Sequence, residues 1–289
     1  MIAVEHSHEN LPGIFESLKG EPASNFEVIV IDTMAEIQDL DLRHSGLNVT
    51  HIRCNQDSRI PHLWARGIRV AKAPLVATTT AHCLPEKNWL GTLLNLDLHG
   101  DVAGVGGAFR NAECSAPMDW AIYFQRYRMF TEHLTATNIP DIAADNAVYR
   151  RAEILNYPAL LDDGFWEPEF HAQFRRKGLK LLFEPALVVI HKNRYSCTQF
   201  ARQRLDHGRA FGEARARRLS LIENLLMLAI SPALGALFFS KIIRDSMAIP
   251  ALRWNVVRAS IWISFFVACW TAGEAMGYLR GLNDSKKLP

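Results

Sequence analysis

The first part of the chain alternates between short apolar runs and segments whose apolar residues recur at helical spacing. Runs of apolar and β-branched residues predict strands, and the helically spaced segments predict helices between them. The predicted strands are residues 2–5, 26–31, 51–53 and 75–79, and the predicted helices are residues 10–18 and 61–73. Strands and helices that alternate in this way form βαβ units, so the pattern predicts an α/β fold with a mostly parallel sheet flanked by helices.

Beyond residue 100 the pattern is less regular. The glycine-rich stretch 102–107 lacks the lysine of a phosphate-binding loop and the spacing of a dinucleotide-binding loop. We interpret it as a strand and turn where two backbones approach closely. Residues 120–130 are rich in aromatic side chains, which favours packing in a core or against a membrane. Residues 181–183 and 187–190 predict two strands on either side of Pro185.

The apolar content of the chain rises toward its C-terminus. Up to about residue 218 polar and apolar residues are mixed, whereas long uncharged runs occupy residues 225–240 and 259–273. Runs of this length are typical of membrane-associated helices. We therefore expect an α/β domain over residues 1–218 and a membrane-associated helical region over residues 219–289.

The two apolar runs differ in how well they suit a membrane span. Residues 225–240 are slightly short for a span of roughly 20 residues and are interrupted by Pro232 and Gly235. Residues 259–279 are long enough but contain Glu274, which we expect to face protein or another subunit of a homo-oligomer. Basic residues before, between and after the runs conflict with the positive-inside bias of a simple hairpin and favour interfacial or re-entrant helices.

Charge and cysteine content narrow the class of protein. A formal net charge of +2 argues against nucleic-acid binding, because such domains carry a clear basic excess. The five cysteines are scattered without a C-x-x-C pair, which indicates a reducing compartment and no zinc site, and we expect no signal peptide. A belt of arginines precedes the first apolar run: Arg202, Arg204, Arg209, Arg215, Arg217 and Arg218. Such a belt favours an anionic cytoplasmic leaflet or a phosphate-bearing ligand, so we expect membrane association with the α/β domain facing the cytoplasm.

Polar residues follow two of the predicted strands at their carboxyl ends. Thr80 and His82 come directly after the strand at residues 75–79, and Asp32 follows the strand at residues 26–31. The carboxyl ends of parallel strands meet at one edge of a sheet, and ligands of open α/β sheets bind there. The sequence therefore predicts a ligand site at this edge.

An ordered set of segments carries a family resemblance over about residues 2–218. The segments are N-L-P-G-I-F-E-S-L, F-E-V-I-V-I-D-T, A-R-G-I-R-V-A-K-A-P-L-V, P-E-K-N-W-L, A-D-N-A-V-Y-R-R, W-E-P-E-F-H-A-Q-F-R-R-K-G and F-E-P-A-L-V-V-I-H. In this order they resemble inverting family 2 glycosyltransferases with the GT-A fold. The resemblance implies transfer of a sugar, with inversion, from a nucleotide-sugar donor to a lipid-linked or polysaccharide-precursor acceptor.

The resemblance also implies a donor site at the strand ends. It places Asp32 at the nucleobase or ribose and Arg66 toward the diphosphate, although a turn role for Asp32 and a solvated Arg66 remain alternatives. In relatives an Asp-x-Asp holds Mg²⁺ or Mn²⁺ where this chain has Thr80-Ala81-His82. Metal dependence therefore stays open: Thr80 would contact a phosphate or a metal-bound water, and His82 would ligate Mn²⁺ or be an ordinary polar loop residue.

Further residues take their expected roles from the same resemblance. Asp145 and Asn146 fall where relatives approach the acceptor and the donor sugar, and His191 falls at a strand end that meets the metal or the diphosphate. Gln203 and Arg204 fall where some relatives hold the acceptor or the pyrophosphate. The segment that contains them also suits the cytoplasmic foot of the membrane region.

The resemblance assigns the catalytic base to Glu167. An inverting transfer needs one carboxylate that takes the proton from the acceptor hydroxyl while the oxygen attacks the anomeric carbon. Counted back from Lys177-Gly178, the Glu-Asp pair of the family falls on Trp166-Glu167, so a Glu replaces the usual Asp. Glu169 and Asp163 are rival acids, and a solvated acid in the first helical turn is the alternative for each of the three.

Two functions of different classes therefore follow from the sequence. The first is a membrane-bound glycosyltransferase, which the ordered Asp32, Glu167 and His191 favour. The second is a catalytically inactive relative that acts as a membrane-bound binding or scaffold subunit, which the missing Asp-x-Asp favours. Neither function requires a nucleic acid.

Overall fold

The computed structural model describes residues 1–5, 8–19, 26–33, 46–112, 116–135, 137–192, 195–217 and 219–285, with side chains up to Gly281. The chain divides into two compact units. The first, which we call the sheet unit, comprises Met1–Ala112 and Met129–Arg194. The second, the helical unit, comprises Glu113–Arg128 and Tyr195–Pro289.

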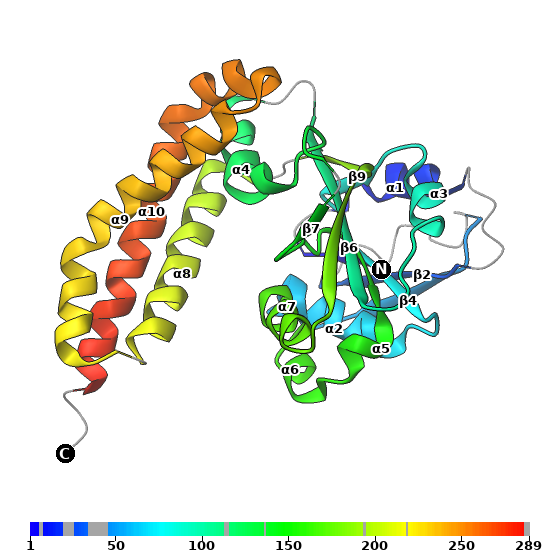
Figure 1. Ribbon diagram of the computed structural model, residues 1–289, viewed down its shortest axis with the longest axis horizontal. Coiled ribbons are helices and arrows are strands. Elements are labelled where there is room, and N and C mark those ends of the chain that lie inside the picture. Colours follow the sequence, from blue (N-terminus) through cyan, green and yellow to red (C-terminus); the bar gives the residue numbers. More distant parts are fainter. Residues whose placement is uncertain are drawn as a thin grey trace. The chain divides into compact units, whose positions relative to one another are not determined.

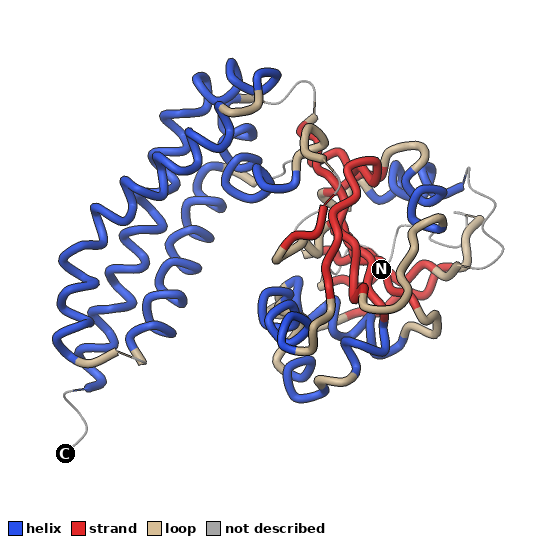
Figure 2. Tube along the Cα trace, in the orientation of Figure 1, coloured by secondary structure: helices blue, strands red, loops and turns tan. Residues whose placement is uncertain are grey.

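The described part of the sheet unit forms a nine-stranded mixed sheet with the order β3-β2-β1-β4-β8-β6-β9-β5, and β7 pairs with β9 (Figure 1; strands red in Figure 2). The strands are β1 (Ile2–Val4), β2 (Val28–Asp32), β3 (Val49–Arg53), β4 (Leu75–Thr80), β5 (Cys83–Pro85), β6 (Val102–Asn111), β7 (Thr137–Ile139), β8 (Asn146–Arg150) and β9 (Lys180–His191). Strands β1 to β4 are mutually parallel where they pair, whereas β8 is antiparallel to both β4 and β6. The carboxyl ends of β2 and β4 therefore share one edge, as predicted.

Helices cover both faces of this sheet. They are α1 (Leu11–Lys19), α2 (Ile60–Val70), α3 (Trp89–Leu94), α5 (Arg151–Leu155), α6 (Pro158–Asp162) and α7 (Glu167–Arg176). Helices α2, α6 and α7 pack on the face that carries Ile29 and Ile31, and α1 and α3 lie over Val28 on the other face. Successive side chains of β2 point to opposite faces of the sheet, so this one strand packs against the helices on both faces. The predicted α/β class with flanking helices is confirmed.

The glycine-rich stretch is part of β6 and lies where backbones approach closely, as interpreted from the sequence. A Cβ added at Gly107 would collide with the carbonyl oxygen of Leu187 in β9 and with the amide of Asn146. One added at Gly106 would lie 2.5 Å from Cβ of Ile142. Only glycine at these positions lets β6 sit between β8 and β9.

Two prolines lie inside a strand and a helix that continue through them, although breaks were predicted at both. The expected break at Pro185 is wrong: β9 is one strand, and its pairing with β6 passes from Glu184 directly to Val188. Pro185 lies in this bulge, where its missing N–H costs no ladder bond. The expected interruption of the first apolar run at Pro232 is also wrong, because one helix continues through it.

The helical unit contains α4 (Pro117–Tyr127), α8 (Cys197–Ala216), α9 (Leu221–Met247) and α10 (Arg253–Ser285). A short 3-10 helix, η3 (Arg128–Phe130), follows α4, and η4 (Pro250–Leu252) joins α9 to α10. Leu221–Met247 and Pro250–Gly281 are long and apolar enough to cross a membrane, judged by length and composition. The predicted domain boundary after residue 218 lies within this unit, between α8 and α9, and stays a prediction.

A seam of glycines joins α8 to α10. Gly208 and Gly212 of α8 meet the backbone of α10 at Trp270 and Glu274, and Gly273 meets the carbonyl of Leu205. The contacts advance along both helices in the same direction, so α8 and α10 run parallel (Figure 1). Small residues spaced by four positions permit this backbone contact.

Candidate functional site

A row of polar side chains involves four strands, β4, β5, β6 and β9, at the predicted edge of the sheet. Strand β4 ends at Thr80, whose hydroxyl donates to Sγ of Cys83 at 3.6 Å. In the sheet register Cys83 pairs with His191 of β9, and His191 pairs with Asn111 of β6. The carbonyl of His82 accepts from the backbone N–H of Lys192 at 2.8 Å. The structure thus places the predicted residues Thr80 and His191 at strand ends, and His82 in the turn between β4 and β5.

Asn111 joins this row without having been predicted. Its side chain is 4% exposed, and neither its amide nitrogen nor its oxygen has a hydrogen-bond partner among the described residues. A buried amide without partners costs free energy, so this one is suited to a polar ligand. No sequence pattern pointed to Asn111, because the strand and turn were expected within residues 102–107, whereas β6 runs to Asn111.

Two predicted acids face one buried tyrosine of β8. Burial raises the pKa of the Tyr149 hydroxyl well above its usual value, and the negative charges of Glu167, Asp141 and Asp145 raise it further. Glu167 is the first residue of α7, and Asp145 directly precedes β8. The structure therefore brings the predicted Glu167 and Asp145 within electrostatic reach of the same group.

The geometry of α7 separates Glu167 from its rivals. Residues four apart lie on one face of a helix, and Glu167 stands four residues before His171, which is fully buried against the sheet. Glu169 lies about 200° around the helix from Glu167 and is exposed, as is Asp163. Of the three acids, Glu167 is the one that acts on Tyr149.

A chain of hydrogen bonds extends from Tyr149 through α7. The Tyr149 hydroxyl lies 3.1 Å from Nε2 of His171, and Nδ1 of His171 lies 3.0 Å from Asp141, which also pairs with Arg175 at 3.2 Å. Burial lowers the pKa of His171 although Asp141 opposes the shift. Burial also opposes ionisation of Asp141, but the hydrogen bonds from His171 and Arg175 prevail and lower its pKa. A neutral His171 fits both bonds, because it accepts from Tyr149 and donates to Asp141.

Asp32 lies at the end of β2, fully buried between basic partners on β3. Its carboxylate pairs with Nε2 of His51, and Nε of Arg53 lies 3.9 Å away. Burial raises the pKa of the neighbouring Cys54 thiol, while the charge of Arg66 lowers it and that of Asp32 raises it. The charges of Asp32 and of the exposed Arg66 therefore both act on the Cys54 thiol. His51 and Arg53 were missed, because their pairing with Asp32 depends on the register of β2 and β3.

The predicted residue Asn146 is held entirely by protein groups. Its oxygen accepts from the Trp89 indole at 2.8 Å, and its amide donates to the carbonyls of Ala108 and Leu187 at 2.9 and 2.8 Å. These bonds tie α3, β6 and β9 to the first residue of β8. The expected contact between Asn146 and the donor stays a prediction.

Gln203 and Arg204 lie in the helical unit, on α8. Gln203 donates to the Tyr195 hydroxyl at 3.2 Å, and the Arg204 guanidinium stacks on the Phe200 and Trp270 rings at 4.9 and 5.5 Å. Burial lowers the pKa of Arg204 to about 10, and the positive charge of Arg126 lowers it further. Nε of Arg204 is buried without a partner in the described chain, which suits an anion.

The strand-end row offers few ligands for a divalent cation. No group of three or more His, Cys, Asp or Glu side chains suited to a metal ion occurs among the described residues. His82 lies in the turn before Cys83, the residue that pairs with His191, but Thr80 and Ala81 stand where oxygen ligands for Mg²⁺ would be needed. These residues do not make a protein-held Mg²⁺ site, so a cation here would take most of its ligands from a bound diphosphate.

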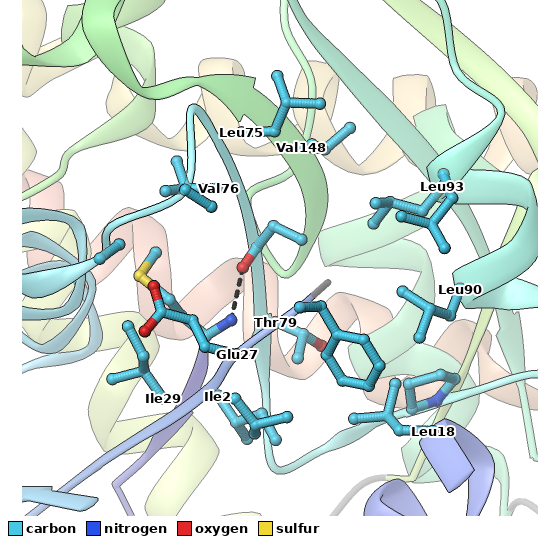
Figure 3. A pocket seen from close by; sticks show the side chains of 18 of the residues that line it. Ile2, Leu18, Glu27, Ile29, Leu75, Val76, Thr79, Leu90, Leu93 and Val148 are labelled. Atoms are coloured by element: carbon cyan, nitrogen blue, oxygen red, sulfur yellow. Dashed lines mark hydrogen bonds between the residues drawn. The ribbon is translucent and has the colours of Figure 1, made fainter. Parts of the chain in front are cut away.

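An apolar cavity of about 280 Å³ lies apart from this row (Figure 3). It opens between α1, α3 and the sheet, and its lining includes Ile2, Leu18, Leu75, Leu90 and Leu93. Among the predicted donor-binding residues none lines it. Its apolar lining does not suit a charged diphosphate.

The sequence matches a family of known proteins. The family model described as Glycosyl transferase family 2 matches residues 2–155, which is more than half of the 289 residues. No curated protein matches the sequence.

Solved structures share the fold at low sequence identity. The mannosyltransferase PcManGT from Pyrobaculum calidifontis, in complex with GDP-Man and Mn²⁺, is 16% identical, with a TM-score of 0.55, over 99% of this chain and 86% of that chain. S. aureus TarS 1-349, in complex with UDP-GlcNAc, is 12% identical, with a TM-score of 0.51, over 91% and 88%. GalNAc-T7 with UDP, GalNAc and Mn²⁺ is 17% identical, with a TM-score of 0.51, over 68% and 43%.

Proposed function

The chain belongs to glycosyl transferase family 2, and we propose that it moves a sugar, with inversion, from a nucleotide-sugar donor to a lipid-linked or polysaccharide-precursor acceptor at the cytoplasmic face of a membrane. The expected family and the GT-A-like fold are confirmed, and the protein is a glycosyltransferase. The observation that supports the finer proposal best is the approach of Glu167 and Asp145 to one buried group, the Tyr149 hydroxyl.

In the proposed reaction Glu167 is the catalytic base. Its carboxylate takes the proton of the acceptor hydroxyl while that oxygen forms a bond to the anomeric carbon of the donor. The bond from the anomeric carbon to the diphosphate breaks in the same step, and the nucleoside diphosphate leaves with the electron pair. Attack from the face opposite the leaving group inverts the anomeric centre. The position of Glu167 at the start of α7, on the inward face of the helix, supports this role.

The donor is proposed to lie along the strand ends. Asp32 and Arg66, whose charges both act on the Cys54 thiol, are proposed to contact the nucleoside and the diphosphate. Thr80, His82 and His191 are proposed to contact the phosphates from the row of strand ends, and the unpartnered amide of Asn111 is added to this group. PcManGT and TarS were solved with GDP-Man and UDP-GlcNAc, which supports a nucleotide sugar as the donor class.

The acceptor side of the proposal rests on the helical unit. Its two long apolar helices support membrane association. The buried Nε of Arg204 and the neighbouring charge of Arg126 suit a phosphate, such as that of a lipid-linked acceptor or of the donor pyrophosphate. Gln203 adjoins Arg204 and is proposed to contact the same ligand.

Calorimetry on the detergent-solubilised chain tests the donor proposal. UDP-, GDP- and CMP-type sugar nucleotides are titrated with Mn²⁺, with Mg²⁺ and with a chelator. We expect one nucleotide class to bind, and His191→Ala and Asn111→Ala to weaken that binding. The chelator arm shows whether a cation bridges the diphosphate to the altered metal position. A folded protein that binds none of the nucleotides under any condition would instead support the inactive binding subunit.

A further inference from the structure

Helix α9 of the helical unit is apolar on its exposed side and mostly polar on its buried side. The buried positions of α9 are Asn224, Ser231, Ile242 and Ser246, three of them polar. Its exposed positions include Ile222 and Leu237, whose side chains are 78% and 66% exposed. Helices in water show the opposite pattern, because burial of apolar side chains drives their packing. An exterior of this kind suits a lipid surface.

The exposed residues of α10 continue the same surface. They recur at helical spacing and form one stripe along the helix: Trp254, Val257, Ile261, Phe265, Ala268, Ala272, Met276 and Leu279. Trp254 and Ile261 are 69% and 74% exposed. We call this stripe, together with the exposed leucines and isoleucine of α9, the apolar face.

Helix α8 gives the unit a second, charged side. Its charged residues recur every three or four positions, as Arg202, Asp206, Arg209, Glu213 and Arg217. Asp206 pairs with Arg209 at 3.0 Å, and Glu213 pairs with Arg280 of α10 at 2.9 Å. These positions are exposed or half-exposed, so α8 presents ionic groups along its length.

The glycine seam fixes this charged helix alongside α10. Contacts run from the Phe200 and Phe266 rings, 4.8 Å apart, to Ala216 beside Gly281. The sixteen residue steps from Phe200 to Ala216 span about 24 Å, close to the roughly 30 Å thickness of a hydrocarbon core. If α9 and α10 crossed the bilayer as a hairpin, most of α8 would have to cross with them. Ionic side chains inside the bilayer are costly, which disfavours that arrangement.

Basic residues also occur at both ends of the α9–α10 hairpin. Lys241, Arg244, Arg253 and Arg258 are exposed near the η4 turn, and Arg217 and Arg280 are exposed at the other end. Among the described side chains of α9 and α10, Glu223 is the one exposed acid. A spanning hairpin would place one basic group on each side of the membrane. A hairpin along the surface places both groups against the anionic headgroups of one leaflet.

We propose that the helical unit lies along one leaflet of an anionic bilayer, with its apolar face in the lipid and α8 toward the water, and does not cross the bilayer. This inference rests on the membrane association in the proposed function, but not on the transfer reaction. The apolar face enters the boundary between headgroups and acyl chains, and the basic residues at both ends bind anionic lipids.

Cysteine labelling in membranes of expressing cells tests the topology. Ala214→Cys places a thiol on α8, and Ala251→Cys places one at the η4 turn; both positions are exposed. A membrane-impermeant maleimide is applied to spheroplasts and to inverted vesicles, and the unsubstituted chain gives the background of the native thiols. We expect both thiols to be labelled from the same side, within about twofold of each other. Labelling of Ala251→Cys from the opposite side would show a spanning hairpin and overturn the proposal.

Vesicle binding tests the assignment of the two sides. Ile261→Glu places a charge on the apolar face, and Ala210→Glu places the same charge at an exposed position of α8. On phosphatidylcholine vesicles containing phosphatidylglycerol, we expect Ile261→Glu to weaken binding about tenfold or more, because an apolar side chain leaves the lipid and a charge enters. We expect Ala210→Glu to change binding by less than about twofold. Phosphatidylcholine alone should bind the unsubstituted chain more weakly.

Two results would contradict the proposal. Equal losses from the two Glu variants would show that the sides are not distinct. Loss of a dimer, measured by light scattering, with unchanged vesicle binding by Ile261→Glu would show that the apolar face joins two copies of the chain. Donor titration of the same variants tests the sheet unit separately. A failed lipid test therefore does not contradict the proposed transfer, which the donor titration tests.

Discussion

The core of the sheet unit and helix α9 of the helical unit bury different kinds of side chain. In the sheet unit, Ile29, Ile31 and Phe170 fill the core, and the polar groups of the site collect at the strand ends. In α9, Asn224 and Ser231 are buried while Ile222, Leu225 and Leu237 are exposed. Buried apolar side chains are typical of a protein surrounded by water, and exposed apolar side chains with buried small or polar ones are typical of helices in contact with lipid. Donor chemistry and membrane attachment should therefore respond to different substitutions.

The largest effect is expected from Glu167→Gln, which should separate catalysis from every other property of both units. Loss of the base should lower the transfer rate by about 10²- to 10⁴-fold. Calorimetric donor binding and vesicle binding should stay unchanged, because the amide keeps the shape of the side chain. Glu169→Gln, on the outward face of the same helix, is the matched control and should transfer at the normal rate. Equal losses of transfer rate in both variants would contradict the assignment of Glu167 as the catalytic base.

Asp32→Asn should weaken donor affinity, with little effect on the rate at saturating donor. A hydrogen bond to a charged group contributes about 1.5–3 kcal/mol, so an increase in KM of roughly tenfold or more is expected. Steady-state kinetics with varied donor measures the split between KM and kcat. A fall in kcat at unchanged KM would show that Asp32 serves the reaction or the fold instead of the donor. The variant should bind vesicles normally, because the substitution lies in the sheet unit.

Gly273→Ala should damage the helical unit while sparing the sheet unit. Its new methyl group meets the Leu205 carbonyl, which is backbone and cannot rotate away, so we expect a loss of about 1–3 kcal/mol in stability. Gly235→Ala is the matched control, because there the methyl group meets the side chain of Thr271, which can rotate. Thermal unfolding in detergent compares the two variants. A smaller loss for Gly273→Ala than for Gly235→Ala would contradict the seam.

The smallest effect concerns the pH dependence of the sheet unit. The pKa of His171 is lowered by burial, so between its folded and unfolded pKa values the unfolded chain binds more protons. Stability should therefore fall as pH drops below the usual histidine pKa of about 6.5. His171→Gln, which keeps partners for Tyr149 and Asp141, should make the melting temperature less sensitive to pH in that range. An unchanged slope in a series of melting curves would show that His171 titrates normally.

Sequence patterns predicted β1 to β4, α1 and α2 well, because short apolar runs and helically spaced apolar residues are local signals. The row formed by Cys83, His191 and Asn111 was only partly predictable, because it depends on strand register between segments far apart in the chain. His51 beside Asp32 was missed for the same reason. The glycines of α8 and α10 stand four residues apart in the sequence, but the pattern alone does not say which two helices meet.

The glycine seam has a practical consequence for producing the protein. A shortened chain that ends after residue 218 would remove the apolar helices but keep α8, whose Gly208 and Gly212 lie against the backbone of α10. It would also strip the buried Phe200 ring of its partner Phe266. Bare backbone and an uncovered aromatic ring make such a fragment prone to aggregate. Ending the chain before Tyr195 removes α8 as well, but it uncovers α4, whose buried Ile122 and Phe124 belong to the same unit, so both truncations expose apolar surface.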